Sequence, residues 1–396
     1  MMHYLFLGSY CFPEEERKLL SISNCGLQTS IILFQNNMLR GLCEQMGPDD
    51  TLDIINYYPI GSYPRQVKKL YVPGEKSDHY IRIPSINIPL IKQAFYNYRV
   101  KKAIRSWVRG LKEAQGMIVM YDLLRPYLTA LTCTTLPNNV RTFSIVADLP
   151  NEYGYKKHET GLRAKIKQRQ GYQNMEMVSQ LSFLGLLTKQ MAIPLKRSDD
   201  SFTVIEGFSN SARFFCPLDT DNKVVLYTGV VSTEYSIDVL LEAFTRLSSN
   251  DYKLWICGSG PSVSLVKEYA NRDQRIIYKG YLSQKDISHL QAEASVLVNP
   301  RQNTGEFTKY SFPSKIIEYL STARPIIAYK LDGIPDDYYD FLIAPKDNSV
   351  NELSNVLQQV LLMPLEEKRK LGLRGRSFVL ERTDPTKQMA KLLFRE

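Results

Sequence analysis

Several features that define common protein classes are missing from this chain. It has no apolar run of the roughly 18 residues that a membrane-spanning helix needs. Its N-terminus, MMHYLFLGSY, lacks the basic region and cleavage site of a signal peptide, and we interpret it as a first strand. The six cysteines form no CxxC pair, and the four histidines lack metal-ligand spacing. These absences argue against an integral membrane protein, a disulfide framework and a zinc enzyme, and they favour a reducing cytosol.

The overall composition is that of an ordinary globular protein. The 396 residues are 44% hydrophobic and 23% charged, which excludes general disorder and favours two domains. The net charge of +9 is unevenly placed, because residues 1–200 hold 26 Lys and Arg against 17 Asp and Glu, whereas residues 201–396 hold 24 of each kind. We therefore expect the first half alone to contact an anionic partner.

Short β-rich runs alternate with longer helical stretches in both halves. The strands predicted in the first half are 4–7, 53–57, 80–83, 117–120 and 142–146, with helices at 27–42, 91–113 and 124–135. Residues 150–200 are predicted to be basic and helical, without strands. The second half has predicted strands at 224–227, 254–257, 276–278, 296–298 and 325–328, with helices at 236–248, 261–271, 284–293, 313–322 and 349–362.

This alternation predicts an α/β protein with two doubly wound Rossmann-like domains facing a cleft. We place the N-terminal domain at residues 1–205 and the C-terminal domain at 206–385. A C-terminal helix, 386–396, is expected to pack back on the N-terminal domain. Sheets of this kind bind ligands beyond the carboxyl ends of their strands, so functional residues are expected in the loops there.

Glycines follow two predicted strands of the second domain. Gly229 follows the first strand, and Gly258 and Gly260 follow the second, in LWICGSGPS. Glycine lets a backbone bend sharply and approach a ligand, although a tight turn alone is the simpler explanation. There is no GxGxxG dinucleotide fingerprint.

A helix is predicted to begin at Pro313, which suits a first turn because it lacks an N–H. Ser314 and Lys315 follow in that turn, where free N–H groups and the helix dipole favour a phosphate. A lysine there is unfavourable unless an anion is present. Glu318, one turn further, is placed to accept two ribose hydroxyls. The alternative is a plain Lys–Glu surface pair at i,i+3.

The stretch 296–318, together with the three glycines, resembles glycosyltransferase family 4 (group 1), above all members that assemble bacterial capsule, exopolysaccharide or O-antigen. The likeness covers most of 203–380, where NPR, EFTKYSFPSK, IEYL and RPII carry it. In the first half NCGLQTSIILFQNNMLRGL, VADLPNEYG and VIEGF are similar to the same family. The resemblance implies a GT-B fold, a nucleotide-sugar donor, no essential metal or cofactor, and retention of anomeric configuration.

The resemblance also implies roles in the second domain. Glu318 matches the second acid of the family's E-x7-E motif and would bind the donor ribose. Lys315 and Arg301 would face the diphosphate, and the donor pocket would be lined by Gly229, Gly258, Gly260 and Ser314. The first acid is missing, because position 310 is Tyr, and the nearby Glu306 is its candidate replacement. The loop 228–234 has no basic residue, so phosphate neutralisation would fall on Arg301 and Lys315.

Two residues are candidates in the first domain. Asp148 follows a predicted strand in VADLPNEYG, where it either caps a turn or faces the cleft. The resemblance implies a catalytic residue there that contacts the acceptor or the transferred sugar. Gly26, in SNCGLQTS, would let the backbone approach the donor diphosphate or the acceptor.

The predicted helix 92–112 contains seven basic residues and no acid. Its apolar stripe (Val100, Ile104, Trp107, Val108 and Leu111) is expected to pack in the core. Its basic face, Lys101, Lys102, Arg105 and Arg109, is expected to contact an anionic membrane, the alternative being a solvated surface. Residues 156–169 add six basic side chains. Nucleic acid is a rival partner, but no recognised nucleic-acid motif appears.

The sequence therefore predicts a retaining glycosyltransferase that is cytoplasmic and peripheral at the inner face of the cell membrane. The donor would be a UDP-, GDP- or dTDP-linked sugar, and the acceptor a polyprenyl-linked lipid or a glycan. A sugar-nucleotide epimerase of the same fold is one alternative, and it would turn over donor without acceptor. A catalytically silent scaffold is the other, and it would bind no nucleotide. The sugar, the base and the linkage stay open.

Overall fold

The computed structural model describes residues 1–396 except 25–26, 28, 90, 150–161, 210–214 and 395–396. It divides the chain into two compact units. Unit 1 comprises Met1–Phe208 with Pro385–Glu396, and unit 2 comprises Ser209–Asp384. The chain thus leaves unit 1 three residues after the predicted boundary and returns to it at the C-terminal segment.

Unit 1 is built on an eight-stranded sheet in the order β10-β9-β8-β7-β1-β2-β5-β4. Its strands are β1 (Met2–Gly8), β2 (Thr51–Asn56), β4 (Glu75–Lys76), β5 (Tyr80–Arg82), β7 (Gln115–Tyr121), β8 (Val140–Val146), β9 (Phe183–Leu186) and β10 (Phe202–Val204). Neighbours are parallel except β4 and β5, and β3 (Tyr71–Val72) forms a separate antiparallel pair with β6 (Ser85–Ile86). The strand order reverses between β1 and β7, which is the switch point where such sheets bind ligands.

The strand β9 lies within residues 150–200, where the sequence pattern predicts none, so that prediction is wrong. Its four residues, FLGL, are all buried. A short strand covered on both faces shows no alternation of apolar and polar residues, and a four-residue apolar run is too short to identify by periodicity.

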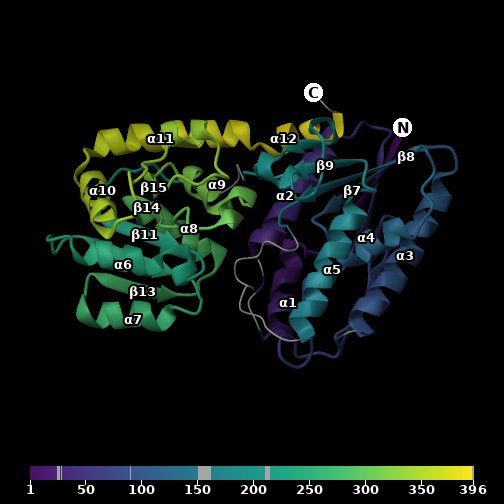
Figure 1. The fold of residues 1–396 in the computed structure, drawn as a ribbon, viewed down its shortest axis with the longest axis horizontal. Coiled ribbons are helices and arrows are strands. Elements are labelled where there is room, and N and C mark those ends of the chain that lie inside the picture. The colour runs from purple at the N-terminus through teal and green to yellow at the C-terminus, as the bar shows by residue number, and fades with distance from the viewer. Residues whose placement is uncertain (25–26, 28, 90, 150–161, 210–214, 395–396) are drawn as a thin grey trace. The chain divides into compact units, whose positions relative to one another are not determined.

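The helices of unit 1 are α1 (Glu16–Ile22), α2 (Thr29–Gln45), α3 (Ile91–Leu111), α4 (Arg125–Thr132), α5 (Leu162–Val178) and α12 (Pro385–Phe394). Figure 1 shows α3, α4 and α5 side by side, in agreement with their contacts. The C-terminal helix α12 packs on α2 so closely that a Cβ on Gly41 would lie 2.3 Å from the carbonyl oxygen of Pro385. Met389 and Leu392 of α12 are fully buried in the same cluster as Phe6. The last helix is therefore part of the N-terminal core.

Unit 2 contains a five-stranded, wholly parallel sheet in the order β13-β12-β11-β14-β15 (Figure 1). Its strands are β11 (Val224–Thr228), β12 (Lys253–Cys257), β13 (Ile276–Gly280), β14 (Val296–Asn299) and β15 (Ile326–Ala328). Its helices are α6 (Ile237–Thr245), α7 (Val263–Arg272), α8 (Gln284–Glu293), α9 (Ser314–Leu320), α10 (Val350–Leu362) and α11 (Leu365–Arg382). The order reverses between β11 and β14, so the loops after these strands mark the switch point of unit 2.

Short 3-10 helices occupy connecting segments of both units. They are η1 (Pro13–Glu15), η3 (Lys189–Ala192), η4 (Asp199–Ser201), η5 (Thr233–Tyr235), η6 (Glu306–Tyr310) and η7 (Asp336–Asp340). Of these, η6 lies between β14 and α9 and η1 lies after β1, so both are in loops at the carboxyl ends of the sheets.

Candidate functional site

The loops that follow β11 and β12 approach each other backbone to backbone. Gly258 has a φ of +139°, which L side chains rarely adopt, and a Cβ there would lie 1.8 Å from the carbonyl oxygen of Gly229. A Cβ on Gly260 would lie 2.2 Å from the carbonyl oxygen of Val231. Glycine is therefore required at both positions by the neighbouring loop.

The N–H groups of two of these glycines are used inside the unit. Gly229 donates to the carbonyl of Cys257 at 3.0 Å, and Gly258 donates to the carbonyl of Gly280 at 2.8 Å. Tight loop packing thus accounts for Gly258 and Gly260. Their place in the lining of a donor pocket stays a prediction.

Lys315 and Glu318 lie one turn apart on α9 and form an ion pair with a Nζ–Oε2 distance of 2.7 Å. Gln291, fully buried on α8, donates to the other carboxylate oxygen of Glu318 at 2.9 Å. The plain i,i+3 pair is thus present. A carboxylate and an ammonium can each make several hydrogen bonds at once, so the pair by itself does not exclude a ligand.

Tyr319 fixes α9 to the end of β11. Its buried hydroxyl accepts a hydrogen bond from the N–H of Thr228 at 2.8 Å and lies 3.1 Å from the Oγ1 of the same residue. Neither Tyr319 nor Gln291 was predicted, because their partners are 91 and 27 residues away in the sequence. No local spacing signals such pairs.

Arg301 follows β14 at the switch point of unit 2 and is only 6% exposed. Its guanidinium lies 4.6 Å from the ring centre of Phe307 and 5.6 Å from that of Tyr235. A terminal nitrogen lies 3.4 Å from the Oγ of Ser311. Stacking on two rings holds this positive charge in a fixed orientation.

Three further predicted positions are less enclosed. The side chain of Glu306 is 77% exposed and pairs with Lys309 at 3.5 Å. Ser314 is exposed and Tyr310 is partly buried. An exposed carboxylate with a flexible partner is held less firmly than Glu318, and the replacement of the missing first acid by Glu306 stays a prediction.

In unit 1 two aspartates follow neighbouring parallel strands. Asp122 comes directly after β7, and Asp148 comes two residues after β8. The Oδ1 atom of Asp122 is buried and has no hydrogen-bond partner in the part of the chain that the structure describes. Burial, and then the charge of Asp148, raises the pKa of Asp122 to about 7, although backbone N–H groups partly offset this.

Two further observations single out Asp122. It lies at the switch point of unit 1, and its φ of +54° is uncommon for a residue other than glycine. The sequence did contain the signal that identifies it, since it follows a buried strand just as Asp148 does. We overlooked it there. The pair places two carboxylates at the carboxyl ends of adjacent strands.

Replacing Asp122 by asparagine is expected to stabilise the protein at high pH. The raised pKa means that Asp122 contributes most stability below its unfolded pKa of about 4, and that this contribution is lost as the pH rises through 7. Asparagine cannot ionise, so its melting temperature should exceed that of wild type by more at pH 8 than at pH 5. The difference should correspond to on the order of 2 kcal/mol.

The matched control for this prediction is Asp49→Asn, at an exposed position of the same unit. Thermal melts of both variants and of wild type at the two pH values provide the measurement. A gain for Asp122→Asn that does not change with pH would show that the carboxyl is not held in a raised-pKa environment.

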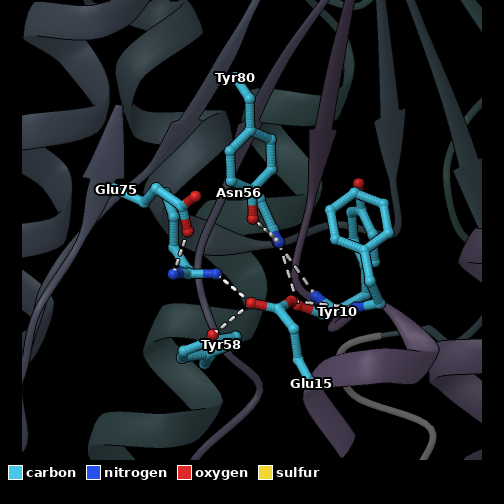
Figure 2. A network of polar contacts seen from close by, with 8 residues as sticks. Tyr10, Glu15, Asn56, Tyr58, Glu75 and Tyr80 are labelled. Atoms are coloured by element: carbon cyan, nitrogen blue, oxygen red, sulfur yellow. Dashed lines mark hydrogen bonds and ion pairs between the residues drawn. The ribbon is translucent and has the colours of Figure 1, made fainter. Parts of the chain in front are cut away.

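Figure 2 shows a network that anchors the segment after β1. Arg82, at the end of β5, pairs with both Glu15 and Glu75 and lies 4.4 Å from the ring centre of Tyr58. The hydroxyl of Tyr58 donates to Glu15 at 2.6 Å. Because Glu15 is the last residue of η1, the network fixes the chain between β1 and α1.

Asn56, at the end of β2, holds the same segment at Tyr10, two residues after the end of β1. Its side chain accepts from the N–H of Tyr10 at 3.1 Å and donates to the carbonyl of Tyr10 at 3.0 Å (Figure 2). The predicted Gly26 follows in the chain but lies outside the described residues, as do residues 156–161 of the basic segment 156–169. The rest of that segment begins α5, where Lys165 and Arg169 are exposed.

The helix α3 buries one face and exposes another. Val100, Ile104 and Leu111 are buried, as the apolar stripe predicts. Lys102, Arg105 and Arg109 are exposed and Lys101 is partly exposed. These four basic residues define what we call the α3 basic face. Because Arg105 also donates to the carbonyl of Cys133 at 2.9 Å, part of the face is anchored to the end of α4.

Lys92, the first basic residue of this helix, is not part of that face. Its ammonium donates to the carbonyl of Gly61 at 3.0 Å and also to that of Ile60, and burial lowers its pKa to about 8. It joins the start of α3 to the segment after β2. In the described part of the chain, no helix is both long and apolar enough to cross a bilayer.

Part of unit 2 matches a known protein family. Residues 222–362 match the family model of group 1 glycosyl transferases. That range contains the loops after β11, β12 and β14 and the whole of α9. No curated protein matches the chain.

Solved structures match both units. TarM of S. aureus, solved with Fondaparinux, α-GlcNAc-glycerol and UDP, has a TM-score of 0.56 at 14% identity over 78% of this chain and 59% of its own. HepE of Anabaena, solved with UDP and glucose, has a TM-score of 0.64 at 12% identity over 99% of each chain. WaaG, a glycosyltransferase involved in lipopolysaccharide biosynthesis, has a TM-score of 0.58 at 13% identity over 100% of each. The fold is GT-B.

The predicted fold class, α/β with two doubly wound Rossmann-like domains, is therefore confirmed. These structures share the fold but only 12–14% of the sequence. This chain spans about three fifths of the length of TarM. The family match covers residues 222–362, and the structural likeness shows the fold.

Proposed function

We propose that this protein is a retaining glycosyltransferase that moves a sugar from a nucleotide donor to a polyprenyl-linked or glycan acceptor in bacterial surface polysaccharide synthesis. The observation that carries the proposal is the match of residues 222–362 to group 1 glycosyl transferases, a range that includes Lys315 and Glu318 on α9. The donor is a UDP-, GDP- or dTDP-linked sugar. The reaction needs no metal ion and no cofactor.

On the donor side, Glu318 accepts the ribose hydroxyls and Lys315 faces the diphosphate. The buried Gln291 orients the carboxylate of Glu318, and Tyr319 holds α9 against β11. Arg301 supplies a second positive charge from the loop after β14. Support comes from HepE and TarM, which share the fold and were solved with UDP.

The chemistry proposed is stabilisation of the leaving group. Negative charge develops on the diphosphate as the glycosidic bond breaks, and a charge fixed beforehand lowers that barrier. The helix α9 has only seven residues, so its dipole is small and the positive potential comes from Lys315 and Arg301. The acceptor hydroxyl attacks from the face that the diphosphate leaves, and its proton passes to the leaving diphosphate; we assign no protein nucleophile.

On the acceptor side, Asp148 accepts the hydrogen bond of the attacking hydroxyl. Asp122 lies beside it, and its pKa of about 7 lowers the negative charge of the pair near neutral pH.

The protein acts at the cytoplasmic face of the cell membrane, to which it binds peripherally. The α3 basic face, with no acid among residues 92–112, supports an anionic lipid surface as its partner. A lipid-linked acceptor would place its reactive sugar at the same surface.

A thermal-shift panel of UDP, GDP and dTDP, and of sugars linked to each, tests the proposed function. A nucleotide that binds only the native state raises the melting temperature. At a nucleotide concentration of one hundred times its Kd, the free energy of unfolding rises by about 2.7 kcal/mol. Binding of no nucleotide would favour the scaffold. Donor turnover equally fast with and without any acceptor would favour the epimerase.

A further inference from the structure

A second surface of unit 1 combines exposed apolar side chains with basic ones. It is formed by α1 and by residues 57–74, which follow β2. The apolar members are Leu20, Tyr63, Leu70 and Tyr71, which are 43%, 44%, 48% and 54% exposed. The basic members are Lys18, Arg65, Lys68 and Lys69, all exposed. We call these eight residues the α1 surface.

The two segments that form the α1 surface are hydrogen-bonded to each other. Lys68 donates its backbone N–H to the carbonyl of Ile22 at 2.8 Å and its ammonium to the carbonyl of Ser21 at 3.1 Å. Asn24 donates its backbone N–H to the carbonyl of Gln66 at 3.0 Å. The exposed side chains of α1 and of residues 63–71 are therefore held as neighbours.

A filled core lies beneath this surface. Leu19, Val67 and Val72 are buried in one cluster, while Leu20, next to the first of them, is exposed. The core beneath α1 is therefore already filled, and the exposed leucines and tyrosines are not needed to complete it. Apolar side chains that cluster on a solvent-exposed surface mark interaction sites.

Most of the charges around these side chains are positive. Residues 17–24 and 57–74 contain no Asp or Glu. Acids do occur at the start of α1 and before it: Glu14 is exposed, Glu16 is partly exposed, and Glu15 shares Arg82 with Glu75. Tyrosine and leucine interspersed with lysine and arginine match a lipid interface, where the rings lie among head groups and the cations meet anionic lipid.

We propose that the α1 surface inserts into an anionic lipid bilayer and is the apolar part of the membrane contact, to which the α3 basic face adds charge. The first turn of α3 is joined to residues 60–61 through Lys92, and α3 exposes Tyr98 to 65%. This inference rests on the membrane location in the proposed function. It does not rest on nucleotide binding.

Vesicle co-sedimentation of the whole chain tests the inference, with vesicles of phosphatidylglycerol and phosphatidylcholine compared with phosphatidylcholine alone. The test variant is Leu70→Ser with Tyr71→Ser. The control is Leu373→Ser with Tyr281→Ser in unit 2, whose side chains are 40% and 60% exposed. Exposed substitutions of this kind leave folding nearly unchanged.

Wild type should bind the anionic vesicles, the control should bind equally, and the test variant should bind about tenfold more weakly, because binding scales with buried apolar area. A second variant, with Lys101, Lys102, Arg105 and Arg109 all changed to Gln, should weaken binding at low salt but not at 0.5 M salt. Salt screens charge contacts and spares apolar ones.

Insertion is also measured directly with Leu70→Trp, whose emission should shift to the blue on adding anionic vesicles, while Leu373→Trp should show no shift. Equal binding of the test variant and wild type, or an unshifted tryptophan at position 70, would overturn the inference. Absence of vesicle binding by wild type would overturn it too, even where nucleotides still raise the melting temperature.

Discussion

Replacing Lys315 by alanine is expected to lower donor turnover about a hundredfold while the fold stays intact. The lost charge contact to the departing diphosphate corresponds to about 3 kcal/mol of barrier. The fold should survive because Lys315 is 32% exposed, and ion pairs near the surface contribute little to stability. Turnover is measured as release of nucleoside diphosphate from the sugar nucleotide that the binding panel identifies.

The chain provides a closely matched control in Lys309. This lysine also pairs with a glutamate three residues away in sequence, at 3.5 Å from Glu306, and it is 42% exposed. Lys309→Ala should therefore reproduce the loss of a lysine and of an ion pair without the loss of turnover. Near wild-type turnover of Lys315→Ala, or an equal loss in both variants, would contradict the assignment of Lys315 to the diphosphate.

Replacing Arg324 by methionine is expected to cause a large loss of stability. Arg324 is 1% exposed, and its guanidinium donates to the carbonyls of Ala294, Cys216 and Thr322 at 3.0, 2.9 and 3.2 Å, and also to that of Ala292. Methionine fills much of the space but leaves these buried carbonyls without their donor. The loss should be about 3 kcal/mol, or a fall of about 6 to 12 °C in the melting temperature.

Arg272→Met is the control, because Arg272 is 70% exposed and pairs with Glu268 on its own helix. Its melting temperature should change by less than about 2 °C. If Arg324→Met had the same melting temperature as wild type, the carbonyls would have found other donors.

Much of unit 2 could be predicted from its sequence. The strands at 224–227 and 296–298 were recognisable as β-branched runs between helical stretches, and both are present. Parallel strands whose helices cover both faces carry strong apolar signals. In unit 1 the same reasoning missed β9, whose four buried residues resemble any short apolar run.

The candidate site was predicted only where its residues follow strands. Glu318 and Lys315 were predicted because they lie at the start of a helix after a buried strand. Gln291 was not predicted, since it is brought to Glu318 by a contact between α8 and α9. Arg324 is part of the motif RPII, yet its hydrogen bonds to carbonyls distant in sequence are known only from the fold. Contacts between segments far apart in sequence are decided by packing, which one chain alone does not reveal.

The central claim is that the start of α9 binds the nucleoside diphosphate of a sugar donor. Calorimetry with UDP, GDP and dTDP on wild type and on Glu318→Ala measures it most directly. Wild type should bind one of the three, and the variant, which loses a charged hydrogen bond worth roughly 1.5–3 kcal/mol, should bind that nucleotide about 10- to 150-fold more weakly. Equal affinity in a folded Glu318→Ala, or no binding of any of the three to wild type, would contradict the claim.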